Sequence, residues 1–301
     1  MGSRGDSGAV TRSRSPIVAV ALVVAVVLII GGVIGLRAYE AASDQGRSST
    51  GVPSSRASPA AAGKPVVLSY TIGSRRPHGT DAWTEGLLFE SRANLLESTG
   101  RFQRSELRSL TLETGEVRTR VKLRPDDYGE GLARAGDRLV QLTYQQGVAY
   151  QYDAESFVRI GELHYANEGW GLDFDPARQQ LVMSNGSAEL TLRDPTTFAV
   201  TKTLKVTSDG MPVVGLNELE VVEGVVWANV WPTDEIVRIE LATGRVTGVL
   251  NVGRLRAMAA AKFAGSEVAN GIAHRPGDPP TRLWVTGKLW PTMFEIDLAG
   301  R

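Results

Sequence analysis

The sequence has no cysteine, only three histidines and no excess of charge of either sign. The absence of cysteine excludes disulfide bonds, thiolate nucleophiles and zinc sites built on cysteine. His78, His164 and His274 lack the close spacing of a histidine metal-binding motif, so a zinc centre is not expected. The 33 basic and 33 acidic residues balance, which argues against a nucleic-acid partner because phosphate binding requires a basic surface.

A long apolar run lies near the N-terminus. Residues 17–36 form a stretch of 20 without a charged side chain, which is long enough to cross a hydrocarbon core of about 30 Å. Arginines precede the run and acidic residues follow it, so the positive-inside rule assigns residues 1–16 to the cytoplasm. We predict a single-pass anchor in the cell membrane and an extracytoplasmic domain. A cleaved secretory signal is the alternative, which would make the domain a secreted one.

After this run the composition changes twice. Residues 37–64 include a stretch rich in Ser, Ala, Gly and Pro, which predicts a flexible linker. Residues 65–301 then read as short alternating strands separated by turns, without a convincing amphipathic helix, which predicts an all-β domain. Residues 253–267 interrupt the strands as an insertion, for which we expect a short helix beside the functional pocket; its role as a lid is a hypothesis.

A short pattern recurs along the domain, in which a polar residue is usually followed by glycine and then by an apolar residue. The copies align on five positions spaced by 45, 40, 48 and 52 residues: Glu85, Glu130, Trp170, Glu218 and Asn270. This period is close to the length of a four-stranded propeller blade, so we predict a five-bladed β-propeller. The last repeat is one strand short, and residues 65–72 are free to supply it. We interpret the glycines flanking Glu130 as a tight turn that presents the carboxylate.

The first strand of each blade begins near the propeller axis, so the aligned positions are expected to meet at one end of the central channel. Several long motifs carry the residues at that end: Tyr128–Leu132, Glu168–Leu172, Leu216–Glu220, Trp227–Asp234 and Val285–Pro291. In order and in content they resemble the plant and bacterial type of glutaminyl-peptide cyclotransferase, over roughly residues 66–298. The resemblance implies a five-bladed propeller that converts the N-terminal glutamine of peptides or proteins to pyroglutamate and releases ammonia, with no cofactor required for catalysis.

The resemblance also implies roles for single residues. Glu130 matches the catalytic glutamate, which would carry a proton from the attacking amine to the departing ammonia, an effect typically worth roughly 10²–10⁴-fold in rate. Lys288 and Asn217 match positions that polarise the γ-amide. The expected substrate-binding residues are Trp83, Glu85, Tyr128, Tyr144, Trp170 and Trp231. Taken alone, each residue also has a structural reading, as a carboxylate or amide bound to turn amides or as a tryptophan in the core.

Four of the substrate-binding residues depart from the family pattern. Trp83 and Tyr128 replace phenylalanines, Tyr144 replaces a tryptophan, and Glu85 replaces a glutamine. The aromatic changes keep a ring but add polar atoms, so they bear on fine specificity.

Two other readings stay open at the level of sequence. A metal-dependent lactonase-like propeller would hold a divalent cation with oxygen ligands, for which the candidates are Glu85, Asn217, Glu218 and Asn270. The same oxygens would also suit a structural calcium ion in the channel. A non-catalytic propeller that binds peptides or envelope components is the third reading.

Overall fold

The computed structural model describes residues 63–299. Within this range the chain is built of strands and a single helix, which confirms the all-β class predicted from the sequence. No helix between residues 63 and 299 has both the length and the apolar character needed to cross a membrane. The predicted anchor, residues 17–36, lies outside the described residues, as does nearly all of the predicted linker.

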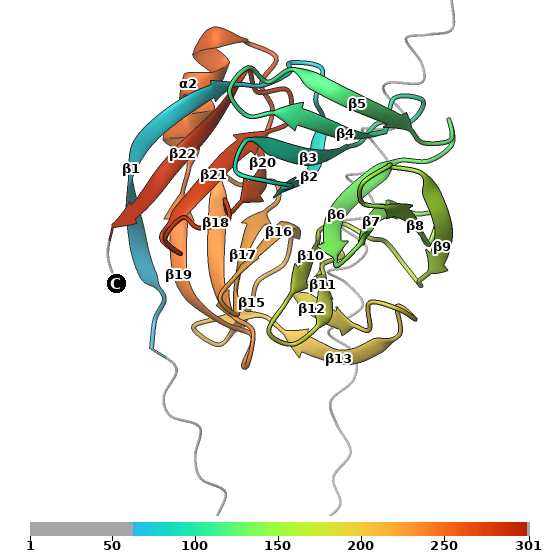
Figure 1. Ribbon diagram of the computed structural model, residues 1–301. Coiled ribbons are helices and arrows are strands. Elements are labelled where there is room, and N and C mark those ends of the chain that lie inside the picture. Colours follow the sequence, from blue (N-terminus) through green and yellow to red (C-terminus); the bar gives the residue numbers. More distant parts are fainter. Residues whose placement is uncertain (1–62, 300–301) are drawn as a thin grey trace, which may run out of the picture. The chain divides into compact units, whose positions relative to one another are not determined.

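Most strands form sets of four in which each strand pairs antiparallel with the next one in the chain (Figure 1). The first set is β2 (Thr84–Phe89), β3 (Asn94–Thr99), β4 (Glu106–Thr111) and β5 (Val117–Lys122). The second is β6 (Gly129–Ala135), β7 (Arg138–Thr143), β8 (Val148–Asp153) and β9 (Arg159–His164). The third is β10 (Leu172–Asp175), β11 (Gln180–Met183), β12 (Glu189–Arg193) and β13 (Val200–Lys205). The fourth is β16 (Leu216–Val222), β17 (Val225–Val230), β18 (Glu235–Glu240) and β19 (Arg245–Asn251).

The fifth set combines the two ends of the described chain. Its strands are β20 (Ala269–Ala273), β21 (Arg282–Gly287), β22 (Thr292–Ala299) and, as the fourth member, β1 (Val66–Pro77). β1 pairs antiparallel with β22, so the N-terminal strand completes the last set, as the sequence predicted. The first residues of β1 also pair in parallel with β19, which joins the fourth and fifth sets. A short hairpin of β14 (Thr207–Ser208) and β15 (Met211–Pro212) connects the third set to the fourth.

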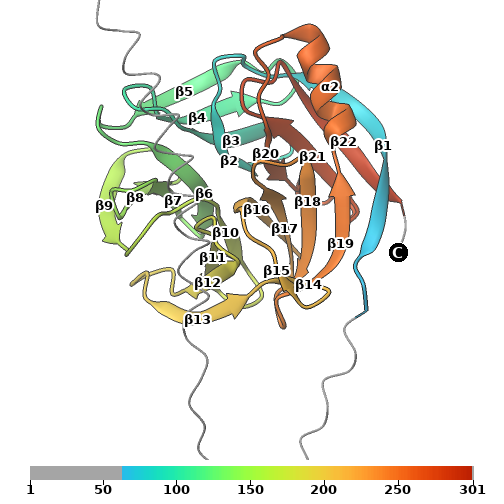
Figure 2. The same cartoon turned by 180° about the vertical axis from the view of Figure 1, so that it is seen from behind.

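The first strands of the sets contact one another in a closed order, from β2 to β6, β10, β16, β20 and back to β2 (Figures 1 and 2). Within a set, the last strand is more exposed than the first. β2 is buried along its whole length, whereas β5 and β9 alternate between half-buried and exposed residues. The first strands therefore lie innermost, and their starting residues are brought together although they are distant in the sequence.

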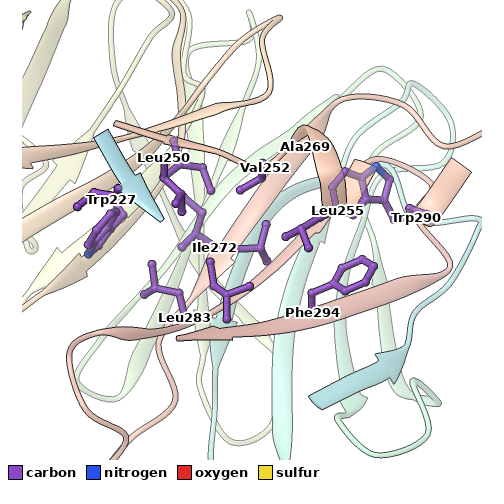
Figure 3. Packing of buried hydrophobic residues seen from close by; sticks show 14 of the residues in the cluster. Trp227, Leu250, Val252, Leu255, Ala269, Ile272, Leu283, Trp290 and Phe294 are labelled. Carbon is purple, nitrogen blue, oxygen red and sulfur yellow. The ribbon is translucent and has the colours of Figure 1, made fainter. Parts of the chain in front are cut away.

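Apolar side chains fill the space between neighbouring sets. Each of five core clusters joins two successive sets, including the fifth set and the first. Figure 3 shows the cluster between the fourth and fifth sets, in which Leu250 lies beside Ile272, and Trp227 and Phe294 lie toward opposite ends. Packing between sets, rather than within one, therefore supplies the core.

The insertion contains α2 (Gly253–Lys262), which confirms the short helix predicted there. Leu255 and Ala259 of α2 are buried in the same cluster as Trp290. Trp290 belongs to the loop after β21 that carries Lys288, and its indole N–H donates to the backbone oxygen of Glu267 at 2.9 Å. This packing favours a supporting role for α2 under that loop over the role of a lid.

A buried charge network ties the first set to the fifth. The Glu97 side chain is fully buried and accepts hydrogen bonds from His78 Nε2 at 2.9 Å and Thr84 Oγ1 at 2.7 Å. Its other oxygen accepts from Arg108 Nε at 3.1 Å and Nη2 at 2.6 Å. Burial alone would raise the pKa of Glu97, but the Arg108 guanidinium and His78 outweigh it and hold the pKa well below its usual range. Nδ1 of His78 in turn contacts the Trp290 carbonyl at 2.9 Å.

We predict that Glu97→Ala lowers the free energy of unfolding by about 3–5 kcal/mol, because it removes the buried counter-charge of Arg108 and leaves only the exposed Asp81, at 3.3 Å, to pair with it. Urea unfolding at pH 7 measures the loss. The matched control is Glu113→Ala, which removes a carboxylate that is 73% exposed and paired with Arg76, and should cost less than about 1 kcal/mol.

The effect should also depend on pH. Since the pKa of Glu97 is depressed in the folded state, its stabilisation is fully present above the unfolded value of about 4.3 and is lost as the pH falls toward the folded pKa. The difference between wild type and Glu97→Ala should therefore narrow below about pH 4. Equal losses in Glu97→Ala and Glu113→Ala would contradict the proposed network.

Candidate active site

The polar residues at the starts of the first strands lie at breaks in the antiparallel pairing. The pairing register shifts between Thr84 and Gly86 in β2, between Gly129 and Leu132 in β6, between Leu216 and Leu219 in β16 and between Ala269 and Ile272 in β20. The residues inside these breaks include Glu85, Glu130, Asn217, Glu218 and Asn270. A bulge of this kind re-aims a side chain away from the regular alternation of a strand. The repeated sequence pattern therefore corresponds to a repeated backbone irregularity.

The glycines of the pattern permit close contact between neighbouring first strands. A Cβ atom added to Gly131 would lie 2.3 Å from the backbone nitrogen of Leu172, and one added to Gly171 would lie 2.0 Å from the Asn217 carbonyl oxygen. Gly129 and Gly131 are both part of β6, and neither has a positive φ angle. The tight turn predicted at the glycines flanking Glu130 is therefore wrong, because both glycines belong to a strand, where Gly129 packs against Thr99 of the first set and Gly131 against Leu172 of the third.

Glu85 and Lys288 form a buried ion pair. Lys288 Nζ donates to Glu85 Oε1 at 2.6 Å, and both side chains are at most 8% exposed. Glu85 Oε1 also accepts from the Tyr128 hydroxyl at 3.1 Å, and Oε2 accepts from Asn270 Nδ2 at 3.0 Å. Burial raises the pKa of Glu85, and the Lys288 ammonium opposes this rise. Both oxygens of Glu85 are thus engaged by the protein, which gives the residue a role in holding Lys288 and Tyr128.

Glu130 differs from Glu85 in its partners. It is 6% exposed, and its carboxyl group accepts no hydrogen bond from residues 63–299. Burial raises its pKa well above the usual range; the nearby charges of Glu85 and Glu168 add to the rise, and Lys288 opposes it. A buried carboxyl without a fixed partner, whose protonated form is favoured, is suited to accept and return a proton.

Aromatic side chains surround these groups. The Lys288 ammonium lies 5.3 Å from the centre of the Trp83 ring. The Tyr128 and Tyr144 rings are 5.9 Å apart, and the Trp170 and Trp231 rings meet edge to face at 5.8 Å. Trp231 is 40% exposed, so the aromatic surface extends from the buried charges to the outside.

Gly186 supports the Trp170 ring. It has a positive φ of 77°, and a Cβ atom there would lie 2.7 Å from the ring. A larger residue at this position would therefore displace Trp170.

Asn217 and Glu218 occupy one bulge but have different surroundings. Asn217 is 3% exposed, and its side-chain oxygen has no hydrogen-bond partner within residues 63–299. Glu218, in contrast, accepts from the backbone N–H groups of Leu87 at 3.3 Å and Ile272 at 2.7 Å. Glu218 therefore links β2 to β20, whereas Asn217 retains an unsatisfied polar atom for another group.

These contacts bear on the predicted oxygen-ligand set. Glu85 is paired with an ammonium group, and Glu218 is bound to two backbone amides. Between residues 63 and 299 no group of three or more acidic or histidine side chains has the arrangement of a metal site. Of the four residues proposed for a cation, Glu85 and Glu218 are therefore engaged by protein groups. The side-chain oxygens of Asn217 and Asn270 have no hydrogen-bond partner within residues 63–299.

Glu168 is a site residue that sequence reasoning did not single out. Its oxygens accept from Trp170 Nε1 at 3.0 Å and from Gln145 Nε2 at 2.8 Å. Burial, together with the charge of Glu168, raises the pKa of Tyr144 to about 12. The sequence feature that could have indicated Glu168 is its position two residues before Trp170, in the motif Glu168–Leu172.

Comparisons with known proteins agree with this geometry. A family model described as glutamine cyclotransferase matches residues 48–298. A curated glutaminyl-peptide cyclotransferase from Arabidopsis thaliana is 38% identical over 224 residues, which cover 74% of this chain and 69% of the relative. The crystal structure of the Myxococcus xanthus glutaminyl cyclase matches with a TM-score of 0.71 and 37% identity, over 78% of this chain and 98% of that one.

The family match and the Arabidopsis relative both span most of the chain, and the solved bacterial structure shares its fold. The protein with the buried Glu130 and the Glu85–Lys288 pair belongs to the glutamine cyclotransferase family.

Proposed function

We propose that this protein converts the N-terminal glutamine of peptides or proteins to pyroglutamate and releases ammonia. The observation that carries the proposal is the buried Glu130 carboxyl, which has no protein hydrogen-bond partner in the described chain and lies in the field of the Glu85–Lys288 pair. The matching family and the Arabidopsis relative of that name support the same reaction.

The reaction needs one proton transfer and no covalent enzyme intermediate. The neutral α-amine of the glutamine attacks its own γ-carboxamide carbon, so a C–N bond forms as a five-membered ring closes. Glu130 accepts the proton released by that nitrogen and delivers it to the leaving amide nitrogen, which departs as ammonia. Since nucleophile and electrophile belong to one residue, the site has only to orient them and move the proton.

Negative charge develops on the γ-amide oxygen during the attack. Lys288 is held at 2.6 Å by Glu85, so its ammonium is oriented before the substrate binds and its remaining protons can stabilise this oxygen. Asn217, whose side-chain oxygen has no described partner, contacts the same amide group. The walls for the uncharged glutamine side chain are Trp83, Tyr128, Tyr144, Trp170 and Trp231, and Glu85 acts by positioning Lys288 and Tyr128.

The fold proposed for this activity is a five-bladed β-propeller. Its blades are the five strand sets, and β1 closes the ring as the outer strand of the last blade. The closed order of contacts between first strands and the five inter-set core clusters support this assignment. Catalysis in this scheme uses no metal or cofactor, and a calcium ion would have a structural role only.

We also propose that residues 17–36 anchor the chain in the cell membrane and that residues 65–301 act outside the cytoplasm. The uncharged run and the arginines before it support this arrangement. The substrates are then exported peptides or proteins that begin with glutamine.

We predict that Glu130→Gln reduces kcat/KM for a short Gln-initiated peptide by at least about 10²-fold, because the amide cannot carry the proton. Ammonia release measures the effect. The unfolding midpoint should not change, since no protein hydrogen bond to the carboxyl is lost. Glu116→Gln, an exposed carboxylate, is the matched control and should retain full activity.

EDTA in the same assay distinguishes the metal-dependent alternative. Wild-type ammonia release should resist the chelator. Loss with EDTA and recovery with calcium would contradict metal-free cyclisation. No release from any Gln-peptide would leave the lactonase-like reading, to be tested with lactones and added calcium, and after it the binding protein.

The pH dependence should respond to Glu168. Its negative charge contributes to the raised pKa of Glu130, so Glu168→Gln lowers that pKa. Because the reaction begins with the Glu130 carboxylate, activity rises as the pH rises through this pKa, and the acidic limb of the kcat/KM profile should move to lower pH in the variant. The α-amine of the substrate titrates identically in both enzymes. Glu155→Gln, an exposed carboxylate of the second strand set, should leave the limb in place; an unmoved limb in Glu168→Gln contradicts the assignment.

Cell fractionation tests the anchor. The full chain should stay with the membranes after an alkaline carbonate wash and enter solution with detergent, as expected of a spanning helix. Release of a shortened chain to the medium would indicate a cleaved signal instead. A soluble cytoplasmic chain would contradict both arrangements.

A further inference from the structure

The loop between β3 and β4 has an unusual backbone. Arg101 has a φ of 88° and Gln103 a φ of 65°, the left-handed region that glycine adopts easily and other residues avoid. Gly100 stands directly before Arg101, yet the strained position is occupied by arginine. Strain of this kind persists where the surrounding structure enforces it and is frequent at functional sites.

The surroundings of this loop do enforce its conformation. Gly100 N donates to the Trp83 carbonyl at 2.8 Å, and Gln103 N donates to the Pro125 carbonyl at 2.9 Å. Ser105 Oγ donates to the Arg101 carbonyl at 2.8 Å and accepts from Gly129 N at 2.9 Å. The loop is thus fastened to the residues beside Glu85 and Glu130, and the Arg101 side chain projects from a rigid base.

The loop adds two side chains to the aromatic surface of the site. The Arg101 guanidinium carbon lies 4.0 Å from the centre of the Trp83 ring, the ring that Lys288 also approaches. Phe102 packs edge to face on Tyr128 at 5.4 Å and is 53% exposed. Arg101 is partly exposed, so its charge reaches the border between the buried site and the outside.

The charge of Arg101 differs from that of Lys288 in being uncompensated. Lys288 is paired with Glu85 at 2.6 Å. No carboxylate of residues 63–299 lies within 4.0 Å of the Arg101 guanidinium, which donates no hydrogen bond to them. A guanidinium that is positioned by stacking and lacks an anionic partner is suited to bind a carboxylate.

We propose that Arg101 is a specificity-determining residue, which favours substrates with an acidic side chain directly after the N-terminal glutamine. This inference rests on the proposed function. With the glutamine between the aromatic walls and its α-carbon toward the outside, the next residue meets the border of the site where Arg101 lies. Its carboxylate then pairs with the guanidinium over Trp83.

Three amidated peptides test the proposal: Gln-Glu-Ala, Gln-Ala-Ala and Gln-Lys-Ala, assayed by ammonia release at low salt. The wild type should prefer the glutamate peptide over the lysine peptide in kcat/KM by about threefold to tenfold, as expected for a partly exposed ion pair. The preference should reside mainly in KM and should fall as salt is raised to 0.5 M. Arg101→Gly should abolish it, and Arg101→Glu should reverse it.

Arg104→Glu is the matched control, since Arg104 is an exposed arginine of the same loop without an aromatic contact recorded for its side chain. It should leave the peptide preference unchanged. Thermal unfolding separates specificity from folding: Arg101→Gly should unfold at no lower temperature than wild type, because glycine relieves the left-handed backbone. If Arg101 had a structural role only, Arg101→Gly would lower the unfolding temperature and leave the ratio of kcat/KM between the peptides unchanged.

The outcomes separate the two proposals. Turnover of all three peptides with equal kcat/KM in the wild type, or an unchanged preference in Arg101→Glu, overturns the role of Arg101 and leaves the cyclisation intact. No ammonia from any peptide overturns the proposed function and with it the role of Arg101.

Discussion

The structure depends on the close approach of the innermost strands to one another. At Gly171 the backbone of one strand set comes so near the next that an added Cβ atom would lie 2.0 Å from the Asn217 carbonyl oxygen. The same contact recurs at Gly131 against Leu172. Four of the five first strands carry a register shift at this level, whereas β10, directly after Gly171, pairs regularly. The bulges contain the polar residues of the site, so close packing of the first strands and the polar site occur at the same level of the structure.

Three buried glutamates show how partners, rather than burial, decide the chemistry of a carboxyl. Glu97 accepts hydrogen bonds from three side chains, including a bidentate arginine, and its pKa is depressed. Glu85 has one ammonium group and two neutral donors, and burial still raises its pKa. Glu130 has no hydrogen-bond partner in the described chain, and burial raises its pKa well above the usual range. Of the three, only Glu130 has a carboxyl group without a fixed partner in the described chain, while the hydrogen bonds of Glu85 and Glu97 connect neighbouring strand sets.

Much of this arrangement could be predicted from the sequence. The recurring pattern predicted the repeated strand sets, and the strand missing from the last repeat predicted that the N-terminal strand would complete it. The long motifs predicted the family. The backbone at Gly129 and Gly131 could not be predicted, because the sequence does not distinguish a glycine that permits a turn from one that permits close packing of strands. The engagement of Glu85 by Lys288 also escaped prediction, since the two residues are 203 positions apart. Arg101 belongs to no sequence motif, and its positive φ angle and its place over Trp83 are features of the folded chain alone.

The pairing of β1 with β22 has a consequence for the order in which the protein can be made. The Ser69 hydroxyl in β1 donates a hydrogen bond to the backbone oxygen of Ala299 in β22, 230 residues later in the sequence. During synthesis the first strand emerges long before its antiparallel partner exists, and before β22 it can pair only in parallel, through its first residues, with β19. β22 is synthesised after every other strand of residues 63–299, and a chain that stops short of β22 lacks the antiparallel partner of its first strand. The fifth strand set can therefore form only after β22 has been synthesised.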